Sequence, residues 1–242
     1  MRARRLVTAG LHDLLLAPAP DVAPRLLGAV LVCARPGGTV GLRLTEVEAY
    51  GGPQDSDLPD PGAHTYRGRT ARNASMFGPP GHVYVYFTYG LHHAVNFVCR
   101  PEGVGGGVLI RSGEVVLGTE AATQRRLANR SSEPAFASLA RGPGNVAQAL
   151  ALTRDDDGAA LADLGTAPDP VARAREEVER RGEDTWTGLV LAQRPASDVV
   201  VTARTGVSGE GGTDAYPWRY ALPGEPTVSP YRKATVKRRR TR

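Results

Sequence analysis

The sequence predicts an α+β fold, and three observations support this prediction. The chain has 242 residues, 41% of them hydrophobic, which suits one large domain or two small ones. Strand-like and helix-like segments follow one another without a regular strand–helix–strand order, which argues against a doubly wound parallel sheet. No segment of the chain is repeated.

The stretch 39–50, TVGLRLTEVEAY, is the clearest predicted strand. Its two-residue period gives one face with three aliphatic residues, two carboxylates and one aromatic ring: Val40, Leu42, Leu44, Glu46, Glu48 and Tyr50. Because charge continues along the apolar face, we expect at least one partly buried carboxylate, a candidate acid or base. The alternative is that the strand leaves the core after Leu44 and both glutamates are solvated.

The stretch 39–50 belongs to the first of two predicted hairpins. A short helix over 21–27 is stopped by Gly28, residues 29–34 form a strand, and the turn at 36–38 leads into 39–50. Every one of these elements is bounded by glycine or proline.

The second predicted hairpin joins residues 83–88 to 94–98 through Tyr89 and Gly90. A tyrosine at the tip of a hairpin cannot share the core of its own strands. We therefore expect Tyr89 to be presented outward or capped by a loop.

Further elements are predicted in the second half of the chain. Strands are expected at 108–112, where Arg111 follows an apolar run, and at 198–203 and 216–222; helices are expected at 118–129, 146–152 and 170–182. The last helix carries many charges and is interpreted as a solvated face without a special function. The segment Gly142-Pro143-Gly144-Asn145 before a helix is typical both of phosphate sites and of simple helix capping.

A long loop, 51–64, and an irregular segment, 65–77, separate the two hairpins. Long loops rich in basic and aromatic residues tend to be functional. This one carries a cluster of three arginines: Arg67, Arg69 and Arg72.

Charge is concentrated at the end of the chain. The net charge is +5, and seven of the eleven residues of 232–242 are lysine or arginine, which is typical of a disordered tail that contacts nucleic acid. The only lysines are Lys233 and Lys237, so the rest of the chain offers no lysine amine as a nucleophile.

The compartment follows from cysteine use and hydropathy. Cys33 and Cys99 are far apart and show no metal-ligand spacing and no disulfide framework, so a reducing cytoplasm is expected. The basic N-terminal segment 1–10 lacks a following apolar run of signal-peptide length, and no segment has the length of a membrane span.

Several motifs in one order resemble the alkyladenine (3-methyladenine) DNA glycosylase family: TEVEAYGG, His64, RNASMF, YVYFTYG, Asn96, VLIRS, GPGNVAQAL and ARTGV. The resemblance covers about residues 11–231. It implies a single domain with a curved antiparallel sheet surrounded by helices, like the C-terminal domain of formyltransferases, and a hairpin that inserts into the DNA minor groove. It also implies a monomer that flips damaged purines out of duplex DNA and needs neither metal nor cofactor.

The resemblance also implies roles for single residues. Glu48 matches the general base, Arg111 a residue that holds the attacking water, and Thr205 a position whose backbone carbonyl contacts that water. The walls of the base pocket match Tyr50, His64 and Tyr86. Asn96 matches the residue that disfavours guanine, and Tyr89 the wedge that enters the duplex.

Contacts to the DNA backbone are expected from Arg67, Arg69, Arg72, Gly144 and Asn145. Three departures from the family pattern stand out: the loop between Tyr50 and His64 is longer, Asn145 replaces a frequent lysine, and the segment 155–195 is extended and has no family role. The predicted substrates are duplexes with 3-methyladenine, 7-methylguanine, hypoxanthine or ethenoadenine, in the cytoplasm and at the nucleoid of a bacterium.

Two alternatives stay open. A metal-dependent nuclease would also place two carboxylates near a basic surface, with a third ligand from Asp55, Asp57 or Asp60. A lesion-binding protein without turnover would keep the pocket and the wedge and not need Glu48 and Arg111.

Overall fold

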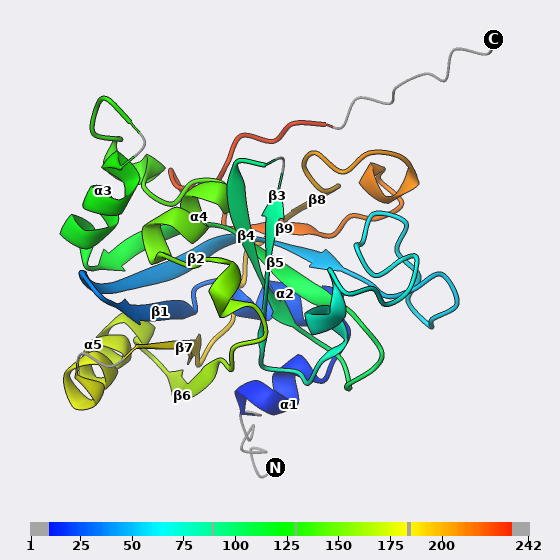
Figure 1. Cartoon of the computed structure of the whole chain (residues 1–242), viewed down its shortest axis with the longest axis horizontal. Helices are drawn as coiled ribbons and strands as arrows, with labels where there is room; N and C mark the ends of the chain where they lie inside the picture. The colour runs from blue at the N-terminus through cyan, green and yellow to red at the C-terminus, as the bar shows by residue number, and fades with distance from the viewer. Residues whose placement is uncertain (1–9, 89, 129, 183–184, 234–242) are drawn as a thin grey trace.

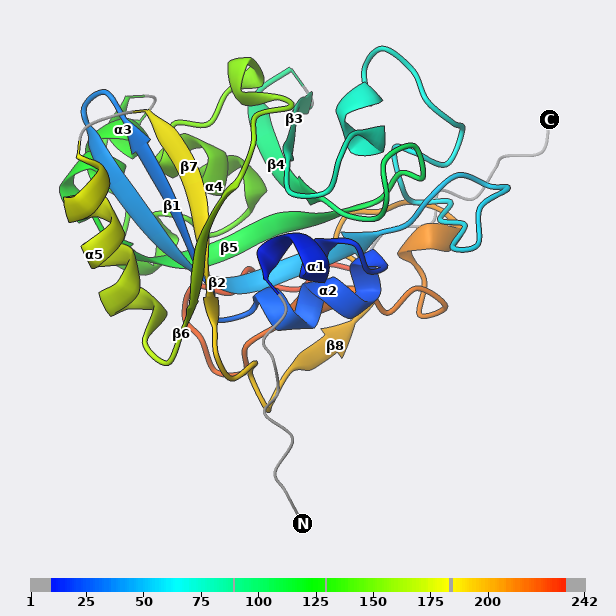
Figure 2. The same ribbon diagram turned by 90° about the horizontal axis from the view of Figure 1, so that it is seen from below.

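The computed structural model describes residues 10–88, 90–128, 130–182 and 185–233. Within these residues, nine strands form one curled sheet, in which the order β3-β4-β5-β2-β1-β7-β6 is extended by β8 and β9 beside β2 (Figures 1 and 2). Most of segment 1–10 and residues 234–242 of the basic tail lie outside the described part. No helix in the described ranges is both long and apolar enough to cross a membrane.

Strand β2 (Gly38–Tyr50) is the centre of the sheet. It pairs antiparallel with β1 (Val30–Arg35), β5 (Gly107–Leu117) and the short β9 (Arg219–Ala221), which itself pairs with β8 (Val200–Thr202). The predicted β1–β2 hairpin is confirmed, whereas β8 and β9 are shorter than predicted. Strand β5 continues past Arg111, because Gly113 lets it approach β2: a Cβ there would lie 2.6 Å from the Arg43 carbonyl oxygen.

A β-bulge divides β2 into two halves. Five of its residues pack in the same core cluster: Val40, Leu42, Leu44, Val47 and Ala49. The interval from Leu44 to Val47 is three residues, and the register with β5 shifts at this point. The extra residue of a bulge reverses which face the following side chains take. The expectation that Glu46, Glu48 and Tyr50 share a face with Leu44 is therefore wrong; the three lie on the opposite face.

The second predicted hairpin is also present. It consists of β3 (Val83–Thr88) and β4 (His92–Val98), and β4 pairs with β5. Tyr89 at its tip lies outside the described residues.

The helices cover the sheet. Helices α1 (Leu11–Leu15) and α2 (Ala19–Leu26) lie together, and α2 packs against β2 and β5 (Figures 1 and 2). Helix α3 (Thr119–Leu127) packs on α4 (Pro143–Leu150), which in turn packs on β4 and β5. Of these, α1 was not predicted. Short 3₁₀ turns complete the described part at Ala74–Phe77, Phe136–Ser138, Arg154–Asp156 and Glu210–Gly212.

The segment 155–195 adds a strand–helix–strand unit: β6 (Ala162–Ala167), α5 (Pro170–Arg181) and β7 (Trp186–Ala192). Because β6 pairs parallel to β7, the sheet is mixed, and the prediction of an antiparallel sheet is wrong at this edge. Helix α5 crosses between these strands and covers the sheet, as parallel pairing requires. It is therefore not merely a solvated face: Ala174 packs on Val30 and Val32, and Glu177 is 2% exposed.

Candidate active site

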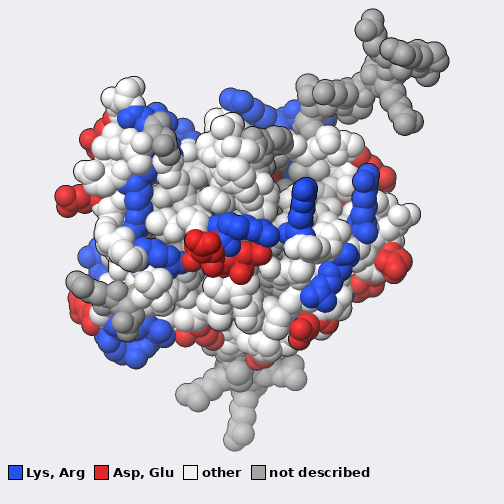
Figure 3. Space-filling model, viewed as in Figure 1, with Lys and Arg blue, Asp and Glu red and all other residues white. Residues whose placement is uncertain are grey.

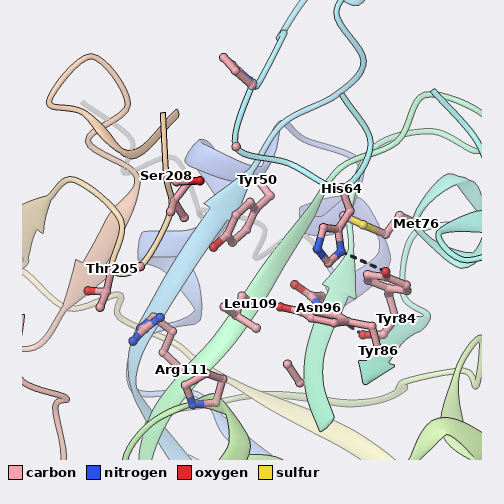
Figure 4. A pocket seen from close by; sticks show the side chains of 16 residues that line it. Tyr50, His64, Met76, Tyr84, Tyr86, Asn96, Leu109, Arg111, Thr205 and Ser208 are labelled. Carbon is pink, nitrogen blue, oxygen red and sulfur yellow. Dashed lines mark hydrogen bonds between the residues drawn. The ribbon is translucent and has the colours of Figure 1, made fainter. Parts of the chain in front are cut away.

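A cavity of about 420 Å³ opens at the end of β2. Leu109 on β5 and Asn96 on β4 form its floor. Glu48 and Tyr84 lie at the same level of the sheet, because Glu48 on β2 is paired with Leu109, Leu109 with Asn96, and Asn96 with Tyr84 on β3. Loops 51–64 and 203–208 form the rim. Figure 4 shows two unlike sides, with Tyr50, Arg111 and Thr205 on one and His64, Tyr84 and Tyr86 on the other.

Glu48 is fully buried and lies directly behind the cavity lining. Three residues that line the cavity donate to it: the Thr205 N–H to Oε1 at 2.7 Å, and the Tyr50 hydroxyl and Arg111 Nη1 to Oε2 at 2.9 and 3.3 Å. A carboxylate oxygen accepts about two hydrogen bonds, so Oε1 retains an acceptor position. The solvated-glutamate alternative is wrong.

Arg111 lies between two carboxylates. Its Nε donates to Glu46 Oε1 at 3.0 Å, while its Nη1 reaches Glu48. Burial lowers the pKa of Arg111, but the charges of Glu48 and Glu46 raise it by more, so the guanidinium is permanently charged. Both ends of Arg111 are thus fixed before any ligand enters.

Glu46 is more completely satisfied than Glu48. Besides Arg111, it accepts from Arg219 Nε at 2.7 Å, from the Ser112 hydroxyl at 2.7 Å, and from the backbone N–H and hydroxyl of Ser229, both at 2.8 Å. Burial raises the pKa of Glu46, but Arg111, Ser112 and Arg219 lower it by more. Glu46 therefore holds Arg111 from behind and does not line the cavity.

Tyr50 bridges the floor and the wall. Burial and the neighbouring Glu48 charge raise the pKa of its hydroxyl well above the ordinary value, so the group remains a donor to Glu48. Its ring lines the cavity.

The opposite wall is aromatic. The rings of Tyr84 and Tyr86 stack with centroids 5.4 Å apart, and His64 meets Tyr86 edge-on at 4.6 Å. His64 Nδ1 lies 3.1 Å from the Tyr84 hydroxyl, and desolvation lowers the pKa of His64. Tyr84 is not among the pocket residues predicted from the sequence. It is 2% exposed but also lines the cavity, and its even spacing from Tyr86 was the available signal.

Asn96 is 3% exposed and lies in the cavity floor, where its amide donates to the Tyr84 carbonyl at 3.2 Å. This bond fixes the plane of the amide. The structure thus brings seven predicted residues to one place: Glu48, Tyr50, His64, Tyr86, Asn96, Arg111 and Thr205.

The predicted DNA-contacting residues of the described part lie outside the cavity lining. Arg67, Arg69 and Arg72 are exposed, and basic side chains are scattered over this face in separate patches (Figure 3). Arg72 and Arg154 line a second hollow, of about 710 Å³, which shares His64, Tyr84 and Tyr86 with the first. On either side of position 89, Phe87 and Leu91 are 55% and 71% exposed.

Helix α4 begins beside the cavity, where Pro143 is part of the lining. Gly144 packs on His92, since a Cβ would lie 2.9 Å from that ring. The Asn145 amide donates to the Arg141 carbonyl at 2.6 Å, so this side chain stabilises the start of α4.

The acidic residues of loop 51–64 do not join the glutamates. Asp60 is fully buried and bound to Arg204, and Asp57 pairs with Arg100. Among the described residues, no group of three or more His, Cys, Asp or Glu side chains is arranged to hold a metal ion. Sequence reasoning missed the Asp60–Arg204 pair, because its partners are 144 positions apart.

Comparison with known proteins gives a consistent result. The model of the methylpurine-DNA glycosylase family matches residues 13–226. A protein of Streptomyces avermitilis named as a 3-methyladenine DNA glycosylase is 48% identical over 224 residues, which are 93% of this chain and 92% of the relative. Proteins of the same name from Leifsonia xyli and Nocardia farcinica are 44% and 42% identical, over 92% and 95% of this chain and 92% and 94% of their own lengths.

Proposed function

Because this chain belongs to the methylpurine-DNA glycosylase family, we propose that it is a base-excision repair enzyme that hydrolyses the bond between a damaged purine and its deoxyribose. The observation that carries this proposal is the pairing of an aromatic cavity with a buried glutamate and a fixed arginine at its floor. Candidate lesions are 3-methyladenine, 7-methylguanine, hypoxanthine and ethenoadenine.

The cavity requires that the base leave the duplex, since the glycosidic bond of a stacked base is out of reach. Flipping costs a few kcal/mol. Tyr89 is the proposed wedge that replaces the base, and the exposed side chains of Phe87 and Leu91 provide an apolar surface next to it. Wedges of this kind enter from the minor groove. The exposed Arg67, Arg69 and Arg72 are the proposed phosphate contacts.

The flipped purine is recognised by the faces of the aromatic rings and by the side-chain amide of Asn96. A flipped purine stacks on Tyr50 and on the His64–Tyr86 wall, and cationic lesions gain an additional attraction to aromatic faces. The fixed amide of Asn96 in the floor crowds an exocyclic amino group such as that of guanine. Because the pKa of His64 is lowered, its imidazole carries little charge near neutrality, and the lesion itself is the better carrier of the leaving-group proton.

Glu48 is the proposed base and electrostatic partner. As the C1′–N bond breaks, its electron pair leaves with the purine and positive charge grows on C1′, which the carboxylate stabilises. Water held by Arg111 and the Thr205 carbonyl attacks C1′, and its proton passes to Glu48 at the remaining acceptor position of Oε1. The products are the free base and an abasic site.

Water is the proposed nucleophile because the chain has lysine only at 233 and 237. Lys233 is 70% exposed and lies 3.7 Å from Asp214. A Schiff-base mechanism needs an amine held in the site. The strand should therefore stay intact, and the enzyme is proposed to act as a monomer on DNA in the cytoplasm.

The test is release of free base from duplexes that contain one hypoxanthine or one 7-methylguanine, in the presence of EDTA and with DNA in excess. We expect repeated turnover, an intact strand until alkali is added, and no adduct trapped by borohydride. Binding without release would favour a lesion-binding protein, and loss of activity in EDTA would favour a metal-dependent enzyme.

A further inference from the structure

An ion pair lies beneath one wall of the cavity. Arg204 and Asp60 are both fully buried, and two nitrogen–oxygen contacts of 2.6 Å join them side by side. Neither residue lines the cavity. A buried pair is costly unless its geometry is good and its remaining polar atoms are satisfied.

The remaining polar atoms tie three segments together. The Asp60 carboxylate accepts from the backbone N–H of Gly51 and of Gly62, at 2.9 and 2.8 Å. The Arg204 guanidinium donates to the Ala49 carbonyl at 3.0 Å and to the Gly211 carbonyl at 2.7 Å. The pair thus joins the end of β2 to both loops of the cavity rim.

The chain segments around Gly62 and Gly211 pack tightly against the Arg204 guanidinium. A Cβ on Gly62 would lie 2.5 Å from Arg204 Nη2, and one on Gly211 would lie 2.3 Å from the backbone nitrogen of Gly62. Glycine is therefore required at 62 by the guanidinium and at 211 mainly by the backbone of Gly62, which packs against it.

The guanidinium also stacks on Tyr50. Arg204 Cζ lies 4.5 Å from the centroid of the Tyr50 ring, whereas the next ring, Trp218, is 5.2 Å away. One face of the Tyr50 ring is thus covered by the cation, and Arg204 itself is not part of the cavity lining. A ligand that stacks on Tyr50 would meet the other face.

We propose that Arg204 and Asp60 are positioning residues that hold the Tyr50 ring and set the charge preference of the cavity for its purine. This proposal rests on the proposed function. A cation on one face of an aromatic ring reduces the negative potential of the other face, so a second cation there is attracted less strongly. Arg204 therefore disfavours cationic purines relative to neutral ones, and Asp60 offsets part of that effect.

The two residues give opposite expectations. Asp60→Asn removes the counter-charge and leaves Arg204 uncompensated, so the ratio of 7-methylguanine to hypoxanthine excision should fall. Arg204→Met combined with Asp60→Asn removes both charges at similar volume, so the ratio should rise, by about 3- to 10-fold given the usual strength of cation–π contacts. Arg204→Lys keeps the charge but loses the side-by-side geometry; both rates should fall and the ratio should stay near that of the wild type.

A matched control is available in α5. Arg181 covers the Trp186 ring at 5.1 Å, far from the cavity, so Arg181→Met removes a comparable contact and should leave the ratio unchanged. All rates are measured in single turnover on duplexes of identical sequence, with folding verified by circular dichroism. If the double variant does not fold, Asp60→Asn alone still tests the sign.

An unchanged ratio in folded Asp60→Asn and in the folded double variant would overturn the proposal, because a merely structural pair lowers both rates together. If the wild type released neither base, the proposed function would fail instead, so the two failures are distinguishable.

Discussion

The two sides of the cavity are built differently. On the side of β2, β5 and β9, buried carboxylates and guanidinium groups hold one another, and each of these ion pairs joins residues far apart in sequence, such as Glu46 and Arg219. On the side of β3, the rings of Tyr84, Tyr86 and His64 pack against each other, and the hairpin ends in exposed apolar side chains. We infer from this contrast that the ionic side carries the chemistry and the aromatic side binds the base. Substitutions on the two sides should then fail in different ways.

The largest effect should come from Glu48→Gln on the ionic side. The amide keeps the shape but cannot take a proton, so excision should fall by about 10²- to 10⁴-fold, the usual contribution of acid–base catalysis. Binding of a lesion-containing duplex should be retained. Single-turnover rates measure the loss, and Glu114→Gln, at a half-exposed carboxylate paired with Arg43, is the control. A near-normal rate would move the base to another residue.

Glu46→Gln should break the scaffold of the ionic side. Arg219 would keep its charge without its buried counter-ion, and Arg111 would lose one of its two; breaking a buried ion pair typically costs about 3–5 kcal/mol of the free energy of unfolding. Urea denaturation measures this cost. An unaltered midpoint would mean that Ser112 and Ser229 suffice to hold the arginines.

The same carboxyl predicts a pH dependence. Since the pKa of Glu46 lies below its ordinary value of 4.5 in the folded protein, its contribution is present above that pH and lost as pH falls through the lowered value. Wild type should therefore lose stability in acid more steeply than Glu46→Gln.

Tyr86→Ala tests the aromatic side. Base–aromatic stacking is worth about 1–3 kcal/mol, so affinity for a damaged duplex should fall about 10- to 100-fold, with a smaller change in the rate of the bound complex. Titration by fluorescence anisotropy followed by single-turnover kinetics separates the two. Phe136→Ala, at a half-exposed ring far from the cavity, should change neither. If the rate falls while affinity is preserved, the division between the two sides is wrong.

The smallest effect is expected at His64. Desolvation lowers its pKa, so the neutral ring is favoured in the folded state; its contribution to stability is complete above the ordinary value of 6.5 and lost as pH falls through the lowered value. The difference in unfolding free energy between wild type and His64→Gln should thus shrink on acidification. His82→Gln, at a surface histidine beside the Pro79 carbonyl, is the comparison.

Local patterns predicted the strands of the site well, and long-range partners poorly. Both hairpins follow from the two-residue period and the turn residues, and the family motifs identify residues that the sheet register brings together. A buried carboxylate was also expected, but on the wrong face of β2. The bulge in β2 was missed, although apolar residues at 42, 44, 47 and 49 carry its 2-3-2 spacing. Nothing local marks Asp60 as the partner of Arg204, or the weakly apolar β6 as a parallel strand, because both depend on chain segments that meet only in the fold.

The contacts of Glu46 also predict an order in which the parts of the site form during folding. Its hydrogen-bond partners Arg219 and Ser229 follow it by 173 and 183 residues. During synthesis, both glutamates and Arg111 emerge long before these partners, and contacts of such separation form late. The central strands should therefore fold first around an unfinished charge cluster, and activity should appear only when the C-terminal segment closes it. Refolding followed in parallel by circular dichroism and by base release would detect this delay, and simultaneous recovery would refute it.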